Sequence, residues 1–178
     1  MLLSVPEKKL VLGILCLLAA ACAKSPVNSA ETAGSRANEP PRIASTDVVE
    51  ATPQEASIAR GASGEALVPI KITQGYHVNA NPASFTYLIA TALELPPAEG
   101  VSVEFITYPD PVIKKFSFAE KPLAVYEGEA IVKATLKVDK SAQPGKHNLS
   151  AKLRVQACDD KVCYAPGVLD LKIPVTLE

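Results

Sequence analysis

The chain has 178 residues, and its 18 Lys and Arg against 19 Asp and Glu give a formal net charge of −1. This length fits one ordinary domain with additional segments, and the balanced charge leaves no basic excess for phosphate binding, so we expect no nucleic-acid partner. The 15 prolines argue against a helical bundle. A four-ligand zinc site would need every Cys and His of the mature domain, so we expect no metal and no cofactor.

Residues 1–21 have the composition of an export signal. Two lysines form a positive start, a short apolar run extends from Leu10 to Leu18, and three alanines precede Cys22. The run is shorter than a membrane-spanning helix requires. Cys22 after small residues resembles a bacterial lipobox, which predicts a lipoprotein signal peptide and a lipidated Cys22. The alternative is an ordinary cleaved signal peptide that leaves Cys22 as a free thiol.

The segment after the signal is polar. Residues 22–45 are rich in Ala, Ser, Pro, Asn and Glu and contain few large apolar side chains. Such a composition cannot bury enough surface to offset the entropy of ordering, so we interpret it as a disordered tether. Residue 23 is Ala rather than Asp, which in enteric-type sorting indicates the outer membrane. The remaining residues, 46–178, form the predicted domain.

This domain is predicted to be built from strands, because its apolar residues alternate with polar ones. The expected strands lie within Glu65–Ile72, Thr86–Leu95, Val101–Phe105, Val132–Val138, Leu149–Ala157 and Leu169–Leu177. The run from Thr86 to Leu95 is more uniformly apolar, which fits a strand buried on both sides or a short helix; the neighbouring strands favour the first. About seven strands with one apolar face each predict an all-β, immunoglobulin-like β-sandwich.

Two cysteines lie between the last two long strands, in the stretch Gln156–Pro166. The export signal places them in an oxidising compartment. Cys158 is expected to end one strand and Cys163 to begin the next. Facing residues of an antiparallel pair have Cα atoms about 4.5–5.5 Å apart, which is within the range that a disulfide requires. The pair can therefore close without distorting the sheet.

Such a bond has two possible roles. As a structural staple it would add only about 2 kcal/mol, because the loop that it closes is short. As a reversible dithiol/disulfide in an exposed loop, it would be open to attack by the thiolate of a partner protein. The spacing alone does not choose between these roles.

The stretch QACDDKVCYAP resembles the active-site hairpin of the N-terminal periplasmic domain of the thiol:disulfide interchange protein DsbD. The resemblance covers most of residues 46–178 and includes Gly75–Pro82, Tyr87–Ile89, Tyr108–Pro109, Lys115–Phe118 and Val125–Gly128. It implies an immunoglobulin-like domain in which Cys158 and Cys163 are the redox-active pair. It also implies that the pair passes electrons to thioredoxin-like periplasmic partners, and that Cys163 forms the mixed disulfide with them.

The same family shields its cysteines with a cap loop that carries an aromatic residue. The matching segment here contains Phe116 and Phe118, and the sequence does not say which of them would serve; both could instead be ordinary core aromatics. Tyr164, Tyr76 and His77 are expected to line the same site by the resemblance. For His77, the alternative is a partly exposed strand residue without a role in the chemistry.

The sequence departs from the family pattern in two ways. The Cys spacing is one residue shorter than expected, and the chain ends soon after Cys163 without the membrane-embedded and thioredoxin-like domains of the whole protein. We therefore expect a stand-alone lipoprotein on the periplasmic side of the envelope whose electrons come from, or go to, a separate protein, for which a membrane electron donor is one candidate. The direction of electron flow, and whether the chain acts as an enzyme, stay open. The alternative is a non-catalytic envelope binding or assembly module in which the Cys158–Cys163 bond is structural.

Overall fold

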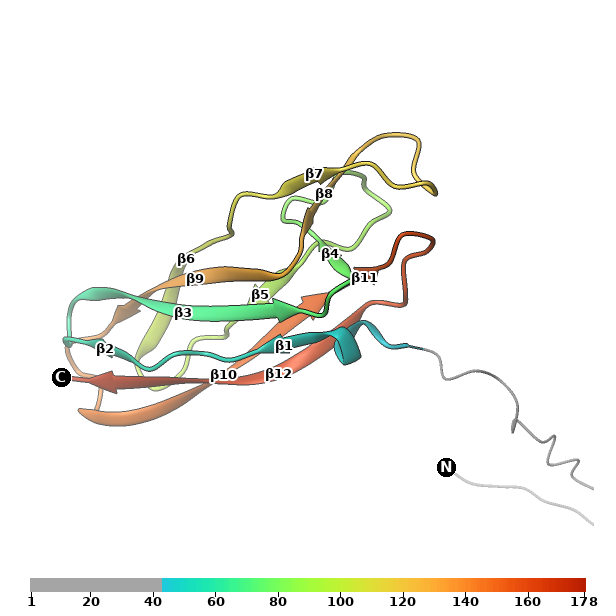
Figure 1. Cartoon of the computed structure of the whole chain (residues 1–178). Helices are drawn as coiled ribbons and strands as arrows, with labels where there is room; N and C mark the ends of the chain where they lie inside the picture. The colour runs from blue at the N-terminus through green and yellow to red at the C-terminus, as the bar shows by residue number, and fades with distance from the viewer. Residues whose placement is uncertain (1–42) are drawn as a thin grey trace, which may run out of the picture. The chain divides into compact units, whose positions relative to one another are not determined.

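The computed structural model describes residues 43–178, and these residues form strands and loops apart from one short 3-10 helix, η1 (Ser45–Val48) (Figure 1). The strands are β1 (Val49–Ala51), β2 (Ala56–Ile58), β3 (Ser63–Ile72), β4 (His77–Asn79), β5 (Ala92–Glu94), β6 (Val101–Thr107), β7 (Val112–Lys114), β8 (Leu123–Tyr126), β9 (Glu129–Val138), β10 (Gly145–Val155), β11 (Ala157–Cys158) and β12 (Gly167–Leu177).

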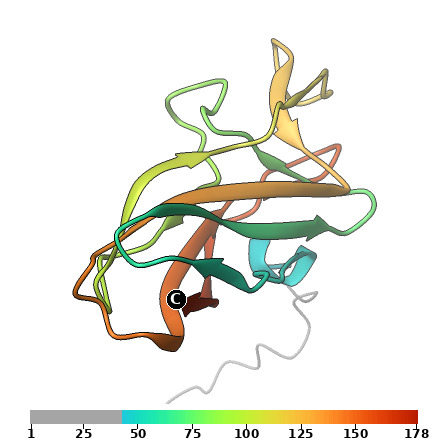
Figure 2. The ribbon, with the colours of Figure 1, turned by 90° about the vertical axis from the view of Figure 1, so that its left-hand side faces the viewer.

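Two four-stranded sheets make the body of the domain. One has the order β1-β3-β9-β6 and the other β2-β12-β10-β5. Figure 2 shows the long strands of the two sheets from the end of the sandwich. The strands β3, β9, β10 and β12 bury every second residue over most of their length, and the buried side chains of both sheets form one apolar core. Because side chains of a strand alternate between its faces, the apolar alternation in the sequence specifies this core directly. The predicted immunoglobulin-like β-sandwich is confirmed.

A third sheet, with the order β11-β4-β8-β7, lies at the end of the sandwich where β10 finishes (Figure 1). It is formed by continuations of the main strands: Gln156 separates β10 from β11, and a turn at Gly128 separates β8 from β9. Gly128 has a φ of 66°, a conformation that glycine adopts without steric cost. This small sheet carries the candidate site.

The predicted strand over Thr86–Leu95 is wrong for most of its length, since only Ala92–Glu94 is a strand. The residues before it form a loop in which side chains bind several backbone groups. The side-chain amide of Asn79 donates to the carbonyl of Ile89 at 3.3 Å, and that of Asn81 donates to the carbonyl of Thr91 at 2.9 Å. Such side-chain hydrogen bonds compete with ladder formation.

The alternation of apolar and polar residues predicts that Val101, Val103 and Phe105 share one face of a strand, and this prediction is wrong for Phe105. The pairing of β6 with β9 shifts between Val103 and Phe105, so that one extra residue is accommodated on β6. A bulge of this kind reverses the side-chain direction beyond it. Phe105 is consequently 58% exposed, whereas its neighbour Ile106 packs against the core.

The last residues of the predicted tether that the structure describes lie against the domain. Ile43 packs against the core, and Ser45 is fully buried and begins η1. The predicted signal peptide, Cys22 and the tether up to residue 42 lie outside the described residues. Within residues 43–178, no helix has the length and apolar character needed to cross a membrane.

Candidate redox site

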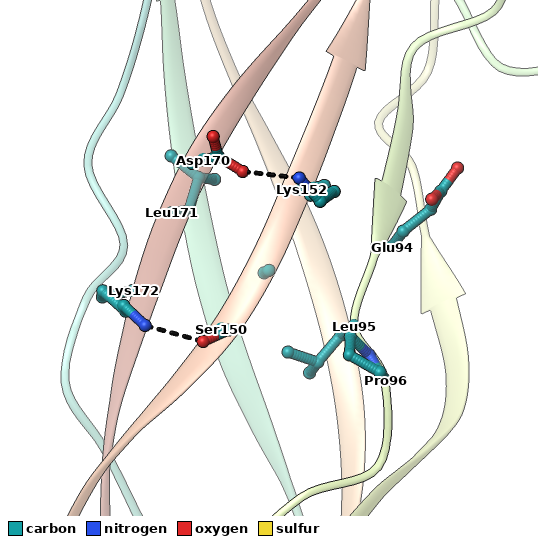
Figure 3. Close-up of a pocket in the computed structure, with 9 residues that line it drawn as sticks. Glu94, Leu95, Pro96, Ser150, Lys152, Asp170, Leu171 and Lys172 are labelled. Atoms are coloured by element: carbon teal, nitrogen blue, oxygen red, sulfur yellow. Dashed lines mark hydrogen bonds and ion pairs between the residues drawn. The ribbon is translucent and has the colours of Figure 1, made fainter.

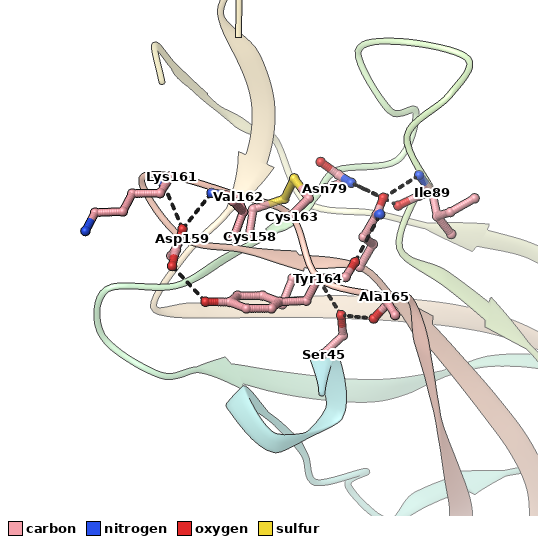
Figure 4. Close-up of a disulfide and its surroundings, with 12 residues drawn as sticks. Ser45, Asn79, Ile89, Cys158, Asp159, Lys161, Val162, Cys163, Tyr164 and Ala165 are labelled. Atoms are coloured by element: carbon pink, nitrogen blue, oxygen red, sulfur yellow. Dashed lines mark hydrogen bonds between the residues drawn. A yellow bond between two sulfur atoms is a disulfide. The ribbon is translucent and has the colours of Figure 1, made fainter. Parts of the chain in front are cut away.

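A disulfide joins Cys158 and Cys163 at the tip of the hairpin between β10 and β12, as Figure 4 shows. Cys158 is the last residue of β11, and Cys163 faces it in an isolated antiparallel bridge. The two Cα atoms are 3.9 Å apart. Cys163 does not begin the next long strand as predicted, because β12 starts only at Gly167. The pairing itself is the predicted one.

The loop between the cysteines is held by the carboxylate of Asp159. This group accepts hydrogen bonds from the backbone N–H groups of Lys161 and Val162, at 2.7 and 2.8 Å, and from the hydroxyl of Tyr164 at 2.7 Å (Figure 4). The hydrogen bond from Tyr164 makes the largest contribution to lowering the pKa of Asp159, and the bond from Val162 makes the next largest. The hydrogen bond between Tyr164 and Asp159 also raises the pKa of Tyr164 to about 12. The turn is therefore fixed by interactions other than the disulfide.

The two sulfur-bearing residues differ in exposure. Cys158 is fully buried, whereas Cys163 is partly exposed. Cys163 lines a pocket of about 270 Å³ whose other lining residues are Tyr87, Leu88, Phe118, Ala119, Leu123 and Gln156. An approaching thiolate would therefore reach Cys163 from this pocket and would not reach Cys158.

Phe116 and Phe118 occupy different environments, although both belong to the loop between β7 and β8. Phe116 is 3% exposed and packs with Leu123 and Val125 in a small apolar cluster. Phe118 is 38% exposed and lines the pocket beside Cys163. Their rings stack with centroids 5.4 Å apart.

The same loop is tied to the cysteine hairpin. The hydroxyl of Ser117, which lies between the two phenylalanines, donates to the carbonyl of Asp160 at 2.9 Å. This bond is exposed, so water can replace it at small cost. This bond between the loop and the hairpin can therefore be broken and remade.

His77 lies directly opposite Cys158 in the pairing of β4 with β11. Its ring is 1% exposed and stacks on Phe116, with centroids 4.0 Å apart. Burial, with a smaller contribution from Lys114, lowers its pKa to about 4, and its Nε2 atom has no hydrogen-bond partner. The ring is therefore neutral at pH 7, and the alternative of a partly exposed strand residue is wrong.

The two predicted tyrosines also lie beside the hairpin. The rings of Tyr76 and Tyr164 are tilted against each other with centroids 6.1 Å apart, and both residues pack against the main core. The fold thus brings together all the described residues that the sequence pointed to, and Cys22 is the one outside the described part.

Sequence reasoning gave no role to Gln156, which connects three segments around the cysteines. Its side-chain oxygen accepts hydrogen bonds from the backbone N–H of Ile89 at 2.8 Å and from the amide of Asn79 at 3.0 Å. Its amide nitrogen donates to the carbonyl of Tyr164 at 3.2 Å. In the sequence, Gln156 is one more polar residue of the alternating stretch Leu149–Ala157, so its partners become visible only in the fold.

A larger hollow, of about 610 Å³, lies over β5, β10 and β12 (Figure 3). An ion pair between Lys152 and Asp170, at 2.8 Å, and a hydrogen bond from Lys172 to Ser150, at 2.6 Å, cross its floor. Its lining contains no Cys or His. In the described part of the chain, no group of three or more His, Cys, Asp or Glu is arranged to hold a metal ion.

Two solved structures are similar to this chain. The reduced form of the DsbD N-terminal domain from Neisseria meningitidis has 19% identity and a TM-score of 0.43, over 66% of this chain and 82% of that one. The N-terminal periplasmic domain of ScsB from Proteus mirabilis has 16% identity and a TM-score of 0.50, over 72% of this chain and 49% of that one, and shares the fold. No curated protein sequence matches the chain.

The family described as the N-terminal part of the thiol:disulfide interchange protein DsbD matches residues 46–172. The match spans the whole sandwich up to the middle of β12 and includes both cysteines of the hairpin. The chain therefore belongs to the family of DsbD N-terminal domains, whose chemistry is thiol-disulfide exchange.

Proposed function

We propose that Cys158 and Cys163 are a redox-active pair through which this domain exchanges electrons with thioredoxin-like proteins in the periplasm. The observation that carries the proposal is the unequal exposure of the two residues: Cys158 is buried, and Cys163 borders a pocket open to a partner. A bond that only pinned the hairpin would add little, because the Asp159 carboxylate and the strand ladder already hold it.

The reaction is a pair of thiol-disulfide exchanges. A Cys163 thiolate attacks the partner disulfide, forms a mixed disulfide and releases one partner sulfur as a thiolate. The Cys158 thiolate then attacks the Cys163 sulfur, which closes the Cys158–Cys163 bond and releases the second partner thiolate. Two electrons pass to the partner, and the two released thiolates take up protons. Because each step is reversible, the same geometry serves transfer in either direction.

Phe118 is the cap residue in this proposal, and Phe116 is its support. Phe118 lines the same pocket as Cys163, and it stacks on Phe116, which itself stacks on His77. Movement of Phe118 would widen the access to Cys163 without disturbing the buried cluster around Phe116. Small thiols would therefore react with the disulfide more slowly while the Phe118 ring is in place than after a partner has displaced it.

The location of the protein follows from the N-terminal sequence. A lipidated Cys22 would hold the domain at the periplasmic face of the envelope, with the outer membrane indicated by Ala23. A separate membrane protein would then supply or receive the electrons. Mass spectrometry of the mature N-terminus tests the anchor: a diacylated Cys22 is expected, and an unmodified N-terminus elsewhere would contradict it.

Trapping of the mixed disulfide tests the exchange itself. A Cys158→Ser variant retains the exposed thiol but lacks the resolving one, so it should accumulate a covalent complex with a thioredoxin-like protein that has an oxidised active site. The matched control is Cys163→Ser, in which only the buried thiol remains, and it should trap none. Equal trapping by both variants, or by neither, would contradict the proposal.

A further inference from the structure

One buried hydroxyl, from a residue outside the cysteine hairpin, is hydrogen-bonded to both arms of the hairpin. Ser45, the first residue of η1, is fully buried. Its Oγ accepts a hydrogen bond from the backbone N–H of Ala157 at 2.9 Å and donates one to the carbonyl of Ala165 at 2.6 Å (Figure 4). Ala157 directly precedes Cys158, and Ala165 follows Cys163 by two positions. One side chain thus binds the backbone on both sides of the disulfide.

The helix that carries this hydroxyl packs closely on the hairpin. A Cβ atom on Gly167, at the start of β12, would come within 2.7 Å of the Cγ2 atom of Thr46, so the glycine permits the close approach. The hydroxyl of Ser45 is therefore held at a fixed place relative to both arms. It is not a flexible surface group that happens to be in range.

We propose that Ser45 is a positioning residue for thiol-disulfide exchange, which keeps Cys158 close to Cys163 while the disulfide is open. The inference rests on the proposed function. When the bond between the cysteines is absent, the Ser45 hydroxyl and the hydrogen bond from Tyr164 N–H to Ala157 O, at 2.8 Å, still join the arms. The Cys158 thiolate is then placed to attack the Cys163 sulfur of a mixed disulfide and to expel the partner thiolate.

The Ser45 hydroxyl should shift the equilibrium between the dithiol and the disulfide towards the disulfide. Holding the two thiols near each other lowers the entropy that is lost when their bond forms, which favours the disulfide. Without the hydroxyl, the reduced hairpin gains freedom, whereas the oxidised hairpin stays joined by the S–S bond. Removal of the hydroxyl should therefore make the disulfide easier to reduce.

The test is the equilibrium of the purified full chain with reduced and oxidised glutathione at pH 7. In Ser45→Ala, the equilibrium constant for oxidation of the dithiol by oxidised glutathione should fall by about threefold to tenfold, the effect expected of one neutral hydrogen bond. A tenfold fall corresponds to a reduction potential about 30 mV higher. The mixed disulfide with glutathione should also persist longer in this variant.

Ser57→Ala is the matched control, because the Ser57 hydroxyl is also hydrogen-bonded, to Glu178, but it lies on β2 near the C-terminus of the chain. This variant should keep the wild-type equilibrium. If Ser45 only stabilised the fold, Ser45→Ala would lower the free energy of unfolding equally in the oxidised and reduced proteins and leave the equilibrium unchanged. That outcome would overturn the inference while leaving exchange by the cysteine pair intact.

If Ser45→Ala does not fold, the role of Ser45 can still be tested on the wild-type protein. Hydrogen exchange of the Ala157 amide can be followed by NMR in both redox states. The inference requires this amide to stay protected when the cysteines are reduced, because its acceptor is the Ser45 hydroxyl. Loss of protection on reduction would contradict it.

Discussion

Replacement of Phe118 by Ala should show whether this residue caps the disulfide or belongs to the apolar core. Phe118 is 38% exposed, so its truncation removes about two thirds of the burial that a core Phe contributes. We expect a loss of about 1–2 kcal/mol in the free energy of unfolding. The stacking of Phe118 on Phe116 is worth about 1 kcal/mol, so its loss should raise the population of the open site, and the rate of reduction by dithiothreitol, about fivefold.

Two other phenylalanines serve as comparisons in the same assays, which are urea denaturation of the oxidised protein and reduction kinetics under excess dithiothreitol. Phe116→Ala should cost about 3–5 kcal/mol, because this ring is buried against His77. Phe105→Ala removes an exposed ring from β6 and should leave the reduction rate unchanged. An unchanged reduction rate in Phe118→Ala would refute the assignment of Phe118 as the cap.

Two further predictions concern the cysteines and the buried histidine. The double variant Cys158→Ser, Cys163→Ser should stay folded by circular dichroism, with a loss of about 2 kcal/mol in urea denaturation, and should lose all thiol exchange; failure to fold would identify the bond as a staple. His77 titrates at about 4 in the folded protein and at 6.5 in the unfolded chain, so the unfolded chain binds more protons between these values. The free energy of unfolding should therefore fall as the pH falls from 6.5 to about 4, by up to about 3 kcal/mol. This loss should be smaller in His77→Gln than in the matched control His147→Gln, and equal losses in the two variants would contradict it.

The strands of the sandwich could be predicted where the alternation of apolar and polar residues matches the alternation of buried and exposed side chains. In β10, every second residue from Leu149 to Val155 is apolar and buried, so the pattern gives both the strand and its inner face. The loop before β5 could not be predicted in this way. Its apolar composition fits a strand, but its backbone is bound by Asn79 and Gln156, whose partners are set by the tertiary fold.

The candidate site was predictable in its residues but not in their arrangement. The motif around Cys158 and Cys163 and the nearby aromatic segments identified the participants. The exposure of Phe118, the burial of Phe116 and the pairing of His77 with Cys158 depend on how β4, β8 and β11 assemble. Ser45 was missed because a lone serine at the end of a polar segment has no pattern that would reveal its burial.

The reduction potential of the Cys158–Cys163 bond tests the central claim most directly. It can be measured at pH 7 in redox buffers, with the fraction of oxidised protein read after alkylation and mass spectrometry. A redox-active pair should have a potential above about −300 mV, within reach of thioredoxin-like partners. A potential below about −300 mV would be that of a structural disulfide, and it would contradict the account of this domain as an electron carrier.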